Sequence, residues 1–391
     1  MKKIGLMIAA VALLVIGGFL FLKNRENTDV NVASVDESVQ EMMTVGPSDF
    51  VLNLERSDED TKNRRSLLKN FIQQKLMPDG QIITNYLPDG AQKNEATGHD
   101  LLSESAGIYL LDLAALDTQG RFDVFYKKMK EMFYDGTQFS YRVSEKGKRY
   151  PVNASLDDLR IMRALIIAEA KFGNDAFNYE KEVKAISTHF LKQSTNNGLL
   201  IDFYDEENKE KSQDISLFYL DYKTLAYLYQ MHGISKDYLQ YQVNIAKNGY
   251  ISDDFPLYHQ KYSYKEEEYQ DGNGVNIIES LLTIRYLAEI GEVQPTSIAF
   301  VKDRVAKGTL FNSYDLNGNA IDKNQSAASY AIAALIGYFV DDQELYTQAI
   351  EILKNFQTMD PTSILYGGFG DTITKEVYSF NNLMALLAYG I

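Results

Sequence analysis

The chain has 391 residues, of which 45% are hydrophobic, so it can bury the core of one large domain or of two ordinary ones. Its net charge of -15 argues against a nucleic-acid partner, because binding a phosphate backbone needs clustered Lys and Arg. It has no cysteine, which excludes disulfides, thiolate metal sites and a catalytic thiol, and its four histidines have no metal-ligand spacing.

The first 25 residues are typical of a membrane-targeting segment. Lys2 and Lys3 precede an apolar run from Ile4 to Leu22, and Lys23 and Arg25 follow it. A run of about 19 apolar residues is long enough to cross the hydrocarbon core of a bilayer. We expect residues 1–25 to form an uncleaved, single-pass signal anchor, with the rest of the chain outside the cytoplasm. A cleaved signal peptide and a secreted protein are the alternative.

Residues 26–48 are polar and lack periodicity, which predicts a flexible stalk. From residue 49 to 391, apolar residues at helical spacing predict about twelve helices. The predicted ranges are 57–77, 101–117, 120–134, 155–173, 177–195, 216–233, 235–249, 275–290, 294–308, 325–340, 342–357 and 377–390.

Short and long connections alternate between these helices, which favours helical hairpins arranged around a ring. Six such pairs would close an all-α (α/α)6 toroid, with function on the face that carries the long loops. A stacked helical-repeat protein is the alternative, although no self-similar period is present. Alternating residues in 138–143 and 199–204 predict small β-hairpins in the long loops.

Glu104 is the first candidate catalytic residue. It lies near the start of an apolar helix and is flanked by Ser103, Ser105 and Ala106. A carboxyl in a tightly packed apolar place favours its protonated form, which can give a proton to a leaving group near neutral pH. An acidic residue in a first helical turn also complements the helix dipole, so this stretch alone leaves both interpretations open.

Two further acidic pairs are candidates. Asp157 and Asp158 lie in the first turn of the helix near 155, where neighbouring side chains point about 100° apart, so one can face the ring centre while the other caps. Asp253 and Asp254 lie in a loop among aromatic residues. A carboxylate there could activate a water molecule or bind a hydroxyl-rich ligand, and a turn Asp bonding its own backbone is equally consistent.

Several of these stretches resemble one family. The run Ala154 to Phe172 looks like the signature of glycoside hydrolase family 8, which reads A-[ST]-D-[AG]-D-x-x-[IM]-A before small, apolar and aromatic positions. Ser103-Glu104 resembles its S-E-G motif, whose Glu is the proton donor. Ser252 to Phe255 resembles its P-D-W motif, whose Asp is the general base, and Ser216 to Tyr219 is similar to a groove-lining S-Y-F-x-P stretch. The motifs keep their order, and the family fold is an (α/α)6 toroid.

The chain also departs from the family pattern. Leu156 replaces the first Asp of the signature, which contacts the sugar at the cleavage point, so Asp157 would have to substitute while Asp158 matches the second Asp. The Gly after the motif's Glu is Ser105, and no tryptophan is present. These departures concern substrate identity, and they leave a catalytically impaired polysaccharide-binding protein as the alternative function.

The resemblance implies an inverting, endo-acting hydrolase of a β-linked polysaccharide, with two carboxyls about 6.5–9.5 Å apart. Glu104 would protonate the glycosidic oxygen, and Asp254, or Asp253 in its place, would activate the water. Asp157 or Asp158 would hold a sugar hydroxyl. Aromatic side chains would stack on sugar faces, and the candidates are Tyr141, Tyr219 and Phe255. No metal or other cofactor is expected.

Related family members accompany exopolysaccharide synthesis machinery, so the resemblance implies an anchored exopolysaccharide hydrolase that limits matrix or biofilm. Its expected partners are the polysaccharide, the membrane and that machinery. Besides the binding protein, a lyase or a phosphorylase on a similar toroid remains open. A lyase would need a Tyr, Lys or Arg base and would yield an unsaturated product.

Overall fold

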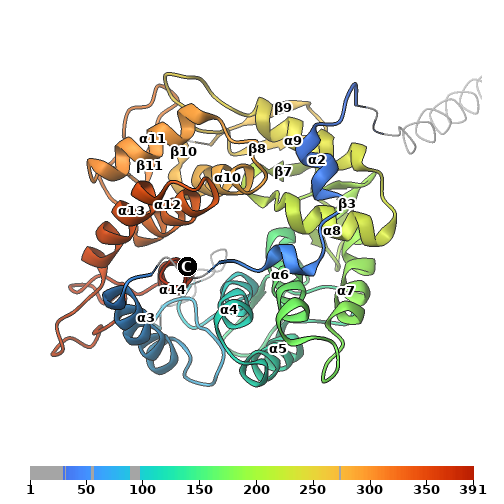
Figure 1. Ribbon diagram of the computed structural model, residues 1–391. Coiled ribbons are helices and arrows are strands. Elements are labelled where there is room, and N and C mark those ends of the chain that lie inside the picture. Colours follow the sequence, from blue (N-terminus) through green and yellow to red (C-terminus); the bar gives the residue numbers. More distant parts are fainter. Residues whose placement is uncertain (1–29, 31, 54–56, 89–96, 273) are drawn as a thin grey trace, which may run out of the picture.

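The computed structural model describes residues 30, 32–53, 57–88, 97–272 and 274–391 (Figure 1). Within these ranges no helix is long and apolar enough to cross a membrane. The anchor predicted over residues 1–25 lies outside the described residues.

The described chain is mostly helical, and its helices follow the predicted ranges closely. The α-helices are α2 (Glu37–Met42), α3 (Glu59–Phe71), α4 (Ser103–Leu116), α5 (Gln119–Phe133), α6 (Ser155–Phe172), α7 (Tyr179–Gln193), α8 (Tyr222–His232), α9 (Lys236–Asn248), α10 (Ile277–Glu289), α11 (Pro295–Ala306), α12 (Ala327–Phe339), α13 (Gln343–Phe356) and α14 (Ser379–Ala388). Three shorter helical turns are η1 (Pro47–Phe50), η2 (Ile72–Leu76) and η3 (Leu217–Tyr219).

Alternate helices close a ring. The inner helices α4, α6, α8, α10, α12 and α14 each contact the next, and α14 contacts α4 (Figure 1). The helices between them in the chain lie outside this ring, where α5 packs on α4 and α6, and α13 on α12. The all-α toroid predicted from the helix spacing is therefore confirmed for the described residues.

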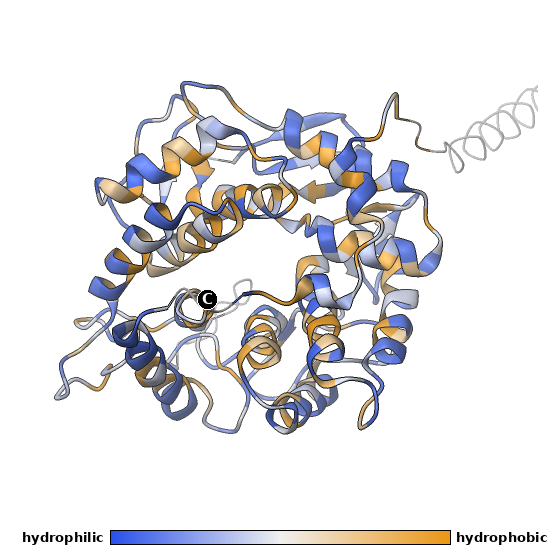
Figure 2. Ribbon diagram, in the orientation of Figure 1, coloured by the Kyte–Doolittle hydropathy of each residue, from blue (hydrophilic) through white to orange (hydrophobic). Residues whose placement is uncertain are grey.

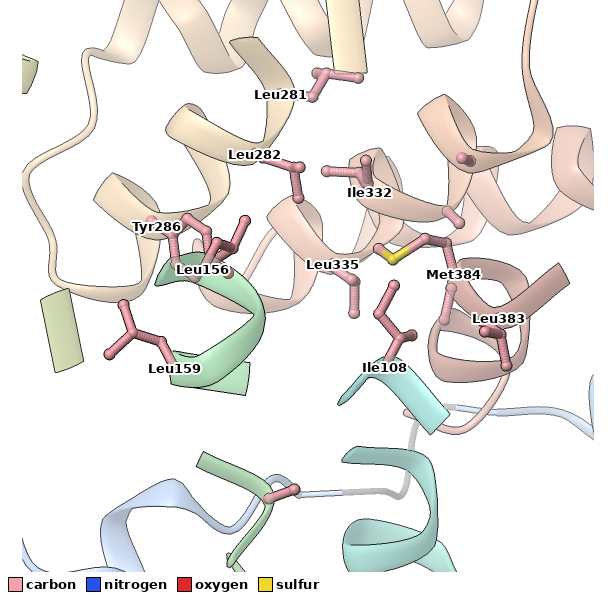
Figure 3. Close-up of a cluster of buried hydrophobic side chains, with 14 of the residues drawn as sticks. Ile108, Leu156, Leu159, Leu281, Leu282, Tyr286, Ile332, Leu335, Leu383 and Met384 are labelled. Atoms are coloured by element: carbon pink, nitrogen blue, oxygen red, sulfur yellow. The ribbon is translucent and has the colours of Figure 1, made fainter. Parts of the chain in front are cut away.

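The inner helices are apolar on nearly every side because neighbours cover them all round. Figure 2 shows this contrast, with polar residues mostly on the outer helices. Figure 3 shows where the inner helices meet: Ile108 from α4, Leu156 from α6, Leu282 from α10, Leu335 from α12 and Met384 from α14 form one cluster. All five are buried, so the centre of the ring is a packed floor rather than a channel.

Buried ion pairs cross-link the ring beneath this floor. Arg163 of α6 bonds to Asp221 at 2.8 Å and to Glu289 of α10, which also pairs with Arg285 at 3.2 Å. Burial alone would raise the pKa of Glu289, but the two arginines outweigh it and lower that pKa to about 2. Glu289 is therefore ionised in the folded chain, and it ties α6 to α10.

The strands are short and lie in the long loops. They are β1 (Leu101–Leu102), β2 (Arg142–Val143), β3 (Thr195–Asn196), β4 (Leu199–Leu200), β5 (Tyr204–Asp205), β6 (Glu210–Lys211), β7 (Asp214–Ser216), β8 (Lys261–Ser263), β9 (Glu268–Gln270), β10 (Val275–Asn276) and β11 (Ser313–Tyr314). All pairs are antiparallel: β1 with β2, β3 with β4, β5 with β6, β7 with β8, β8 with β9, and β10 with β11. The β3–β4 hairpin lies in the loop where one was predicted, and β2 pairs instead with β1, directly before α4.

The stalk predicted over residues 26–48 needs a correction. Within it, α2 packs against α8 and α9, with Val39 and Met42 buried. Asp36 accepts hydrogen bonds from Gln240 at 3.0 Å and from Lys247 at 3.1 Å. These contacts are with residues some 200 positions away, so local polarity does not reveal them.

Candidate active site

A cavity of about 230 Å³ opens where the inner helices begin. Its walls are the first turns of α4 and α14, the first two turns of α6 and α10, and η3. The lining residues are Glu104, Leu156, Asp157, Arg160, Phe218, Tyr219, Asn276, Ile278, Glu279, Leu282 and Phe380. The first turn of a helix carries unpaired backbone N–H groups and a partial positive charge, so it is a favourable place for acidic side chains.

Glu104 is the second residue of α4 and reaches into this cavity. Gly107, one turn further on, lets α4 approach α6 closely, since a Cβ there would lie 3.2 Å from the Cβ of Arg160. The Arg160 guanidinium stands 3.6 Å from the Glu104 carboxyl. Burial raises the pKa of Glu104 to about 7; Arg160 acts against this rise and the nearby Asp157 adds to it. Near neutral pH a substantial fraction of Glu104 is therefore protonated.

Asp157 lies beside Glu104 and is firmly held. Its carboxyl accepts a hydrogen bond from the Ser103 hydroxyl at 2.7 Å and pairs with Arg160 at 3.1 Å. Burial raises its pKa, against the effect of Arg160. Arg160 thus bridges the two acidic groups and fixes α4 against α6.

Asp158 points elsewhere. It accepts a hydrogen bond from the Asn153 side chain at 2.7 Å, is buried, and does not line the cavity. Burial raises its pKa well above the ordinary range of a carboxyl. The two neighbouring carboxyls therefore face different surroundings, and of the pair only Asp157 lines the cavity.

The structure does not bring Asp253 or Asp254 to this cavity. Both are exposed, and Asp253 accepts a hydrogen bond from the Tyr250 hydroxyl at 2.9 Å. The loop is fastened to the outer helix α11, because Ser297 donates to the Pro256 carbonyl at 2.8 Å. The pairing of Glu104 with Asp254 across one cleft, predicted from the resemblance, does not agree with this arrangement.

Of the aromatic residues predicted to stack on sugars, only some line the cavity. Tyr219 of η3 lines the cavity, and burial raises its pKa well above the usual value, with Asp157, Asp202 and Glu104 adding to the rise. Phe255 is buried and packs against Phe300 and Tyr314, so its ring has no free face for a sugar.

Tyr141 lies outside the cavity lining. It is half-buried beside the ring of Tyr150, and its carbonyl accepts a hydrogen bond from the Ser103 backbone at 3.0 Å. The backbone of Tyr141 thus helps to hold the start of α4, next to Glu104.

Sequence reasoning missed Glu279, the third residue of α10. It lines the cavity and carries the third carboxyl there, after Glu104 and Asp157. Burial raises its pKa to about 7, the nearby Asp202 adds to this, and a hydrogen bond with Gln260 opposes it. The available signal was an acid three residues after Asn276, which caps α10 by accepting from the Ile278 N–H at 2.9 Å. That spacing is also typical of an ordinary helix-capping sequence, so it does not by itself identify Glu279 as a site residue.

A second cavity of about 690 Å³ adjoins the first, and the two share Asn276, Ile278 and Phe380. It runs along the first turns of α12 and α14 and the loop that joins α13 to α14. Amides and aromatic rings dominate its lining, among them Asn312, Gln325, Asn381, Phe356, Phe369 and Tyr378. Amides that bond hydroxyls and rings that cover apolar faces suit a polyhydroxylated chain.

In the described part of the chain, no group of three or more His, Cys, Asp or Glu residues is arranged to hold a metal ion. The chemistry that the cavity supports is proton transfer between carboxyl groups and a bound molecule.

No family model matches the chain. It is 32% identical to an alpha-amylase from Clostridium perfringens, with a TM-score of 0.77 over 84% of this chain and 97% of the amylase. It is 27% identical over 326 residues to YdaJ of Bacillus subtilis (strain 168), covering 81% of this chain and 84% of YdaJ. The fold also matches a family 8 xylanase from Teredinibacter turnerae in complex with xylohexaose, at 13% identity and a TM-score of 0.57 over 87% of this chain and 95% of the xylanase.

The toroid is the fold of helical-ring glycosidases such as the amylase and the xylanase. The fold of the chain is that of the glycoside hydrolase family 8 enzymes.

Proposed function

We propose that the chain hydrolyses a β-linked bacterial exopolysaccharide outside the cell, by an inverting, endo-acting mechanism in which Glu104 is the general acid. One observation carries the proposal: Glu104 lines a cavity with two other carboxyls, and burial holds its pKa at about 7. A general acid works best when its pKa lies near the working pH.

In this mechanism Glu104 gives its proton to the glycosidic oxygen as the bond to the anomeric carbon breaks. Water attacks that carbon from the opposite side and loses a proton to an ionised carboxylate, which inverts the configuration. Asp157, fixed by Ser103 and Arg160, holds a sugar hydroxyl beside the cleaved bond. Further sugar units occupy the adjoining cavity, with its amides and aromatic rings.

The anchor predicted over residues 1–25 would keep the hydrolase at the cell surface, beside the machinery that makes the polysaccharide. Its role would be to limit matrix or biofilm by cutting that product. The amylase relative favours a second candidate substrate, an α-linked glucan.

The test uses the full chain in detergent, supplied in turn with exopolysaccharide and with starch. New reducing ends would measure cleavage, and the first-formed anomer by NMR would report inversion. Glu104→Gln should lose about 10²- to 10⁴-fold in rate on the polysaccharide. It should keep most activity on a dinitrophenyl glycoside, whose leaving group needs no proton.

Equal rates for parent and Glu104→Gln on the polysaccharide would refute the assignment. Binding without new reducing ends would favour the impaired binding protein, and an unsaturated, UV-absorbing product would indicate a lyase.

A further inference from the structure

We infer that Glu279 is the catalytic base of this glycosidase and that Gln260 is the residue that positions it; the inference rests on the proposed hydrolase function. In the reaction, the oxygen of water forms a bond to the anomeric carbon while the glycosidic C–O bond breaks. The leaving oxygen takes the proton of Glu104, and Glu279 takes the proton of the water. Exchange with solvent then restores both groups.

The first support is the position of Glu279. Glu104 lies on α4 and Glu279 on α10, and both border the cavity of about 230 Å³. One water molecule takes about 30 Å³ of liquid volume, so the cavity has room for a sugar and a water between the two helices. Ile278, beside Glu279, is shared with the larger cavity, so a glycan lying along both would pass this carboxyl.

The second support comes from comparing the carboxyls in the cavity. Asp157 is paired with Arg160 and bonded by Ser103, so its oxygens already have partners. Among the described residues, no cation forms an ion pair with Glu279. Its carboxylate can therefore accept a proton from water without first breaking a salt bridge.

The third support is the way Gln260 is fixed. Its backbone N–H donates to Asp271 at 2.9 Å, and its carbonyl accepts from the Leu217 N–H at 2.9 Å. Its side-chain oxygen accepts from the Gly272 N–H at 3.0 Å. The side-chain NH₂ is then the group that donates to Glu279, which orients the carboxylate and favours its ionised form.

Asp202 is another carboxyl whose charge acts on Glu279. Asp202 accepts hydrogen bonds from the backbone and the hydroxyl of Ser216, at 2.6 Å and 2.8 Å, and Lys261 acts on it from β8. Asp202 does not line the cavity. Burial is the main cause of the raised pKa of Glu279; the charge of Asp202 adds to it, and the hydrogen bond from Gln260 opposes both.

The experiment compares Glu279→Gln with Asp202→Asn and Asp254→Asn in the full chain, with and without sodium azide. We expect Glu279→Gln to lose about 10²- to 10⁴-fold in kcat on a glycan that the parent cleaves. Azide, which needs no base, should restore turnover and give a glycosyl azide of inverted configuration. Asp254→Asn should stay within about threefold of the parent, and azide should not rescue Glu104→Gln on that glycan.

Gln260→Met supplies a readout that a purely structural role would not change. Removing its hydrogen bond raises the pKa of Glu279, so the acidic limb of the kcat/KM profile should move to higher pH. The inference is overturned by a Glu279→Gln variant near parental activity, by azide rescue of Asp202→Asn or Asp254→Asn instead, or by an unmoved acidic limb in Gln260→Met. A parent that cleaves no glycan would overturn the proposed function itself, and the inference with it.

Discussion

Glu104→Gln should stabilise the protein at alkaline pH, because the raised pKa of Glu104 has a thermodynamic cost. The ordinary pKa of 4.5 rises to about 7 on folding. The native state then binds this proton more tightly than the unfolded chain does. Folding stability is unaffected by this group below pH 4.5, falls as the pH rises toward 7, and stays lowered above pH 7.

The size of the effect follows from the same two values. Since a tenfold change in proton affinity is worth about 1.4 kcal/mol, ionised Glu104 would cost about 3 kcal/mol if it were fully shielded from water. The cavity leaves 34% of the side chain accessible, and solvent screening reduces the cost to about 1–2 kcal/mol. Glutamine keeps the shape and loses the charge, so the variant should regain this amount at pH 8 and nothing at pH 4.5.

Urea unfolding of the parent and the variant at pH 4.5 and pH 8 measures the difference. Glu289→Gln is the control of opposite sign, because Arg163 and Arg285 lower the pKa of Glu289 to about 2. Its ionised form stabilises the fold, so that variant should be less stable than the parent across pH 5–8. If Glu104→Gln were destabilised at pH 8, or if its effect did not change with pH, burial would not control this carboxyl.

Three further predictions concern the surroundings of Glu104. Arg160→Met removes the positive charge that lowers the pKa of Glu104, so the alkaline limb of the kcat/KM profile should move to higher pH. The same change leaves Asp157 without its ion pair, so thermal denaturation should show that the free energy of unfolding falls by about 3–5 kcal/mol. Gly107→Ala forces α4 away from α6 and should reduce kcat by about tenfold, whereas Gly120→Ala, whose Cβ meets no atom within 4 Å, should leave kcat unchanged. Because the cavity carries three carboxyls and one arginine, a uronic acid polymer should be cleaved more slowly than a neutral glycan. The difference between the two cleavage rates should become smaller when salt is added, because salt screens the repulsion.

The helices were predictable because their packing produces a pattern of apolar residues within each helix. The range 155–173 became Ser155–Phe172, and 342–357 became Gln343–Phe356. Each inner helix is buried on most sides and each outer helix on one, so apolar residues recur at helical spacing in both. In α2, by contrast, Val39 and Met42 are too few to form a pattern, and their burial depends on α8 and α9.

A site residue could be predicted only where the residues that determine its packing lie close to it in the sequence. Glu104 is followed three residues later by Gly107, which lets α6 approach closely, so the packing of Glu104 against α6 could be anticipated. Asp254 and Glu279 are both acids in aromatic or apolar surroundings, and the sequence does not tell which one faces the ring centre. The attachment of the Asp254 loop to α11 decides this, and it is a long-range contact.

The geometry of the ring nevertheless suggests a rule for finding such residues. Every inner helix begins on the same face, since each is preceded by an outer helix that returns the chain. The helical residues that line the smaller cavity occupy the second, third or sixth position of an inner helix: Glu104, Leu156, Asp157, Arg160, Ile278, Glu279, Leu282 and Phe380. Positions two and six are four residues apart and positions three and six are three apart. Each pair is separated by about one turn, so all three positions lie on one side of a helix. An acid at the third position of an inner helix is thus a candidate for the cavity whatever capping pattern surrounds it, and on this criterion α10 presents Glu279 just as α6 presents Asp157.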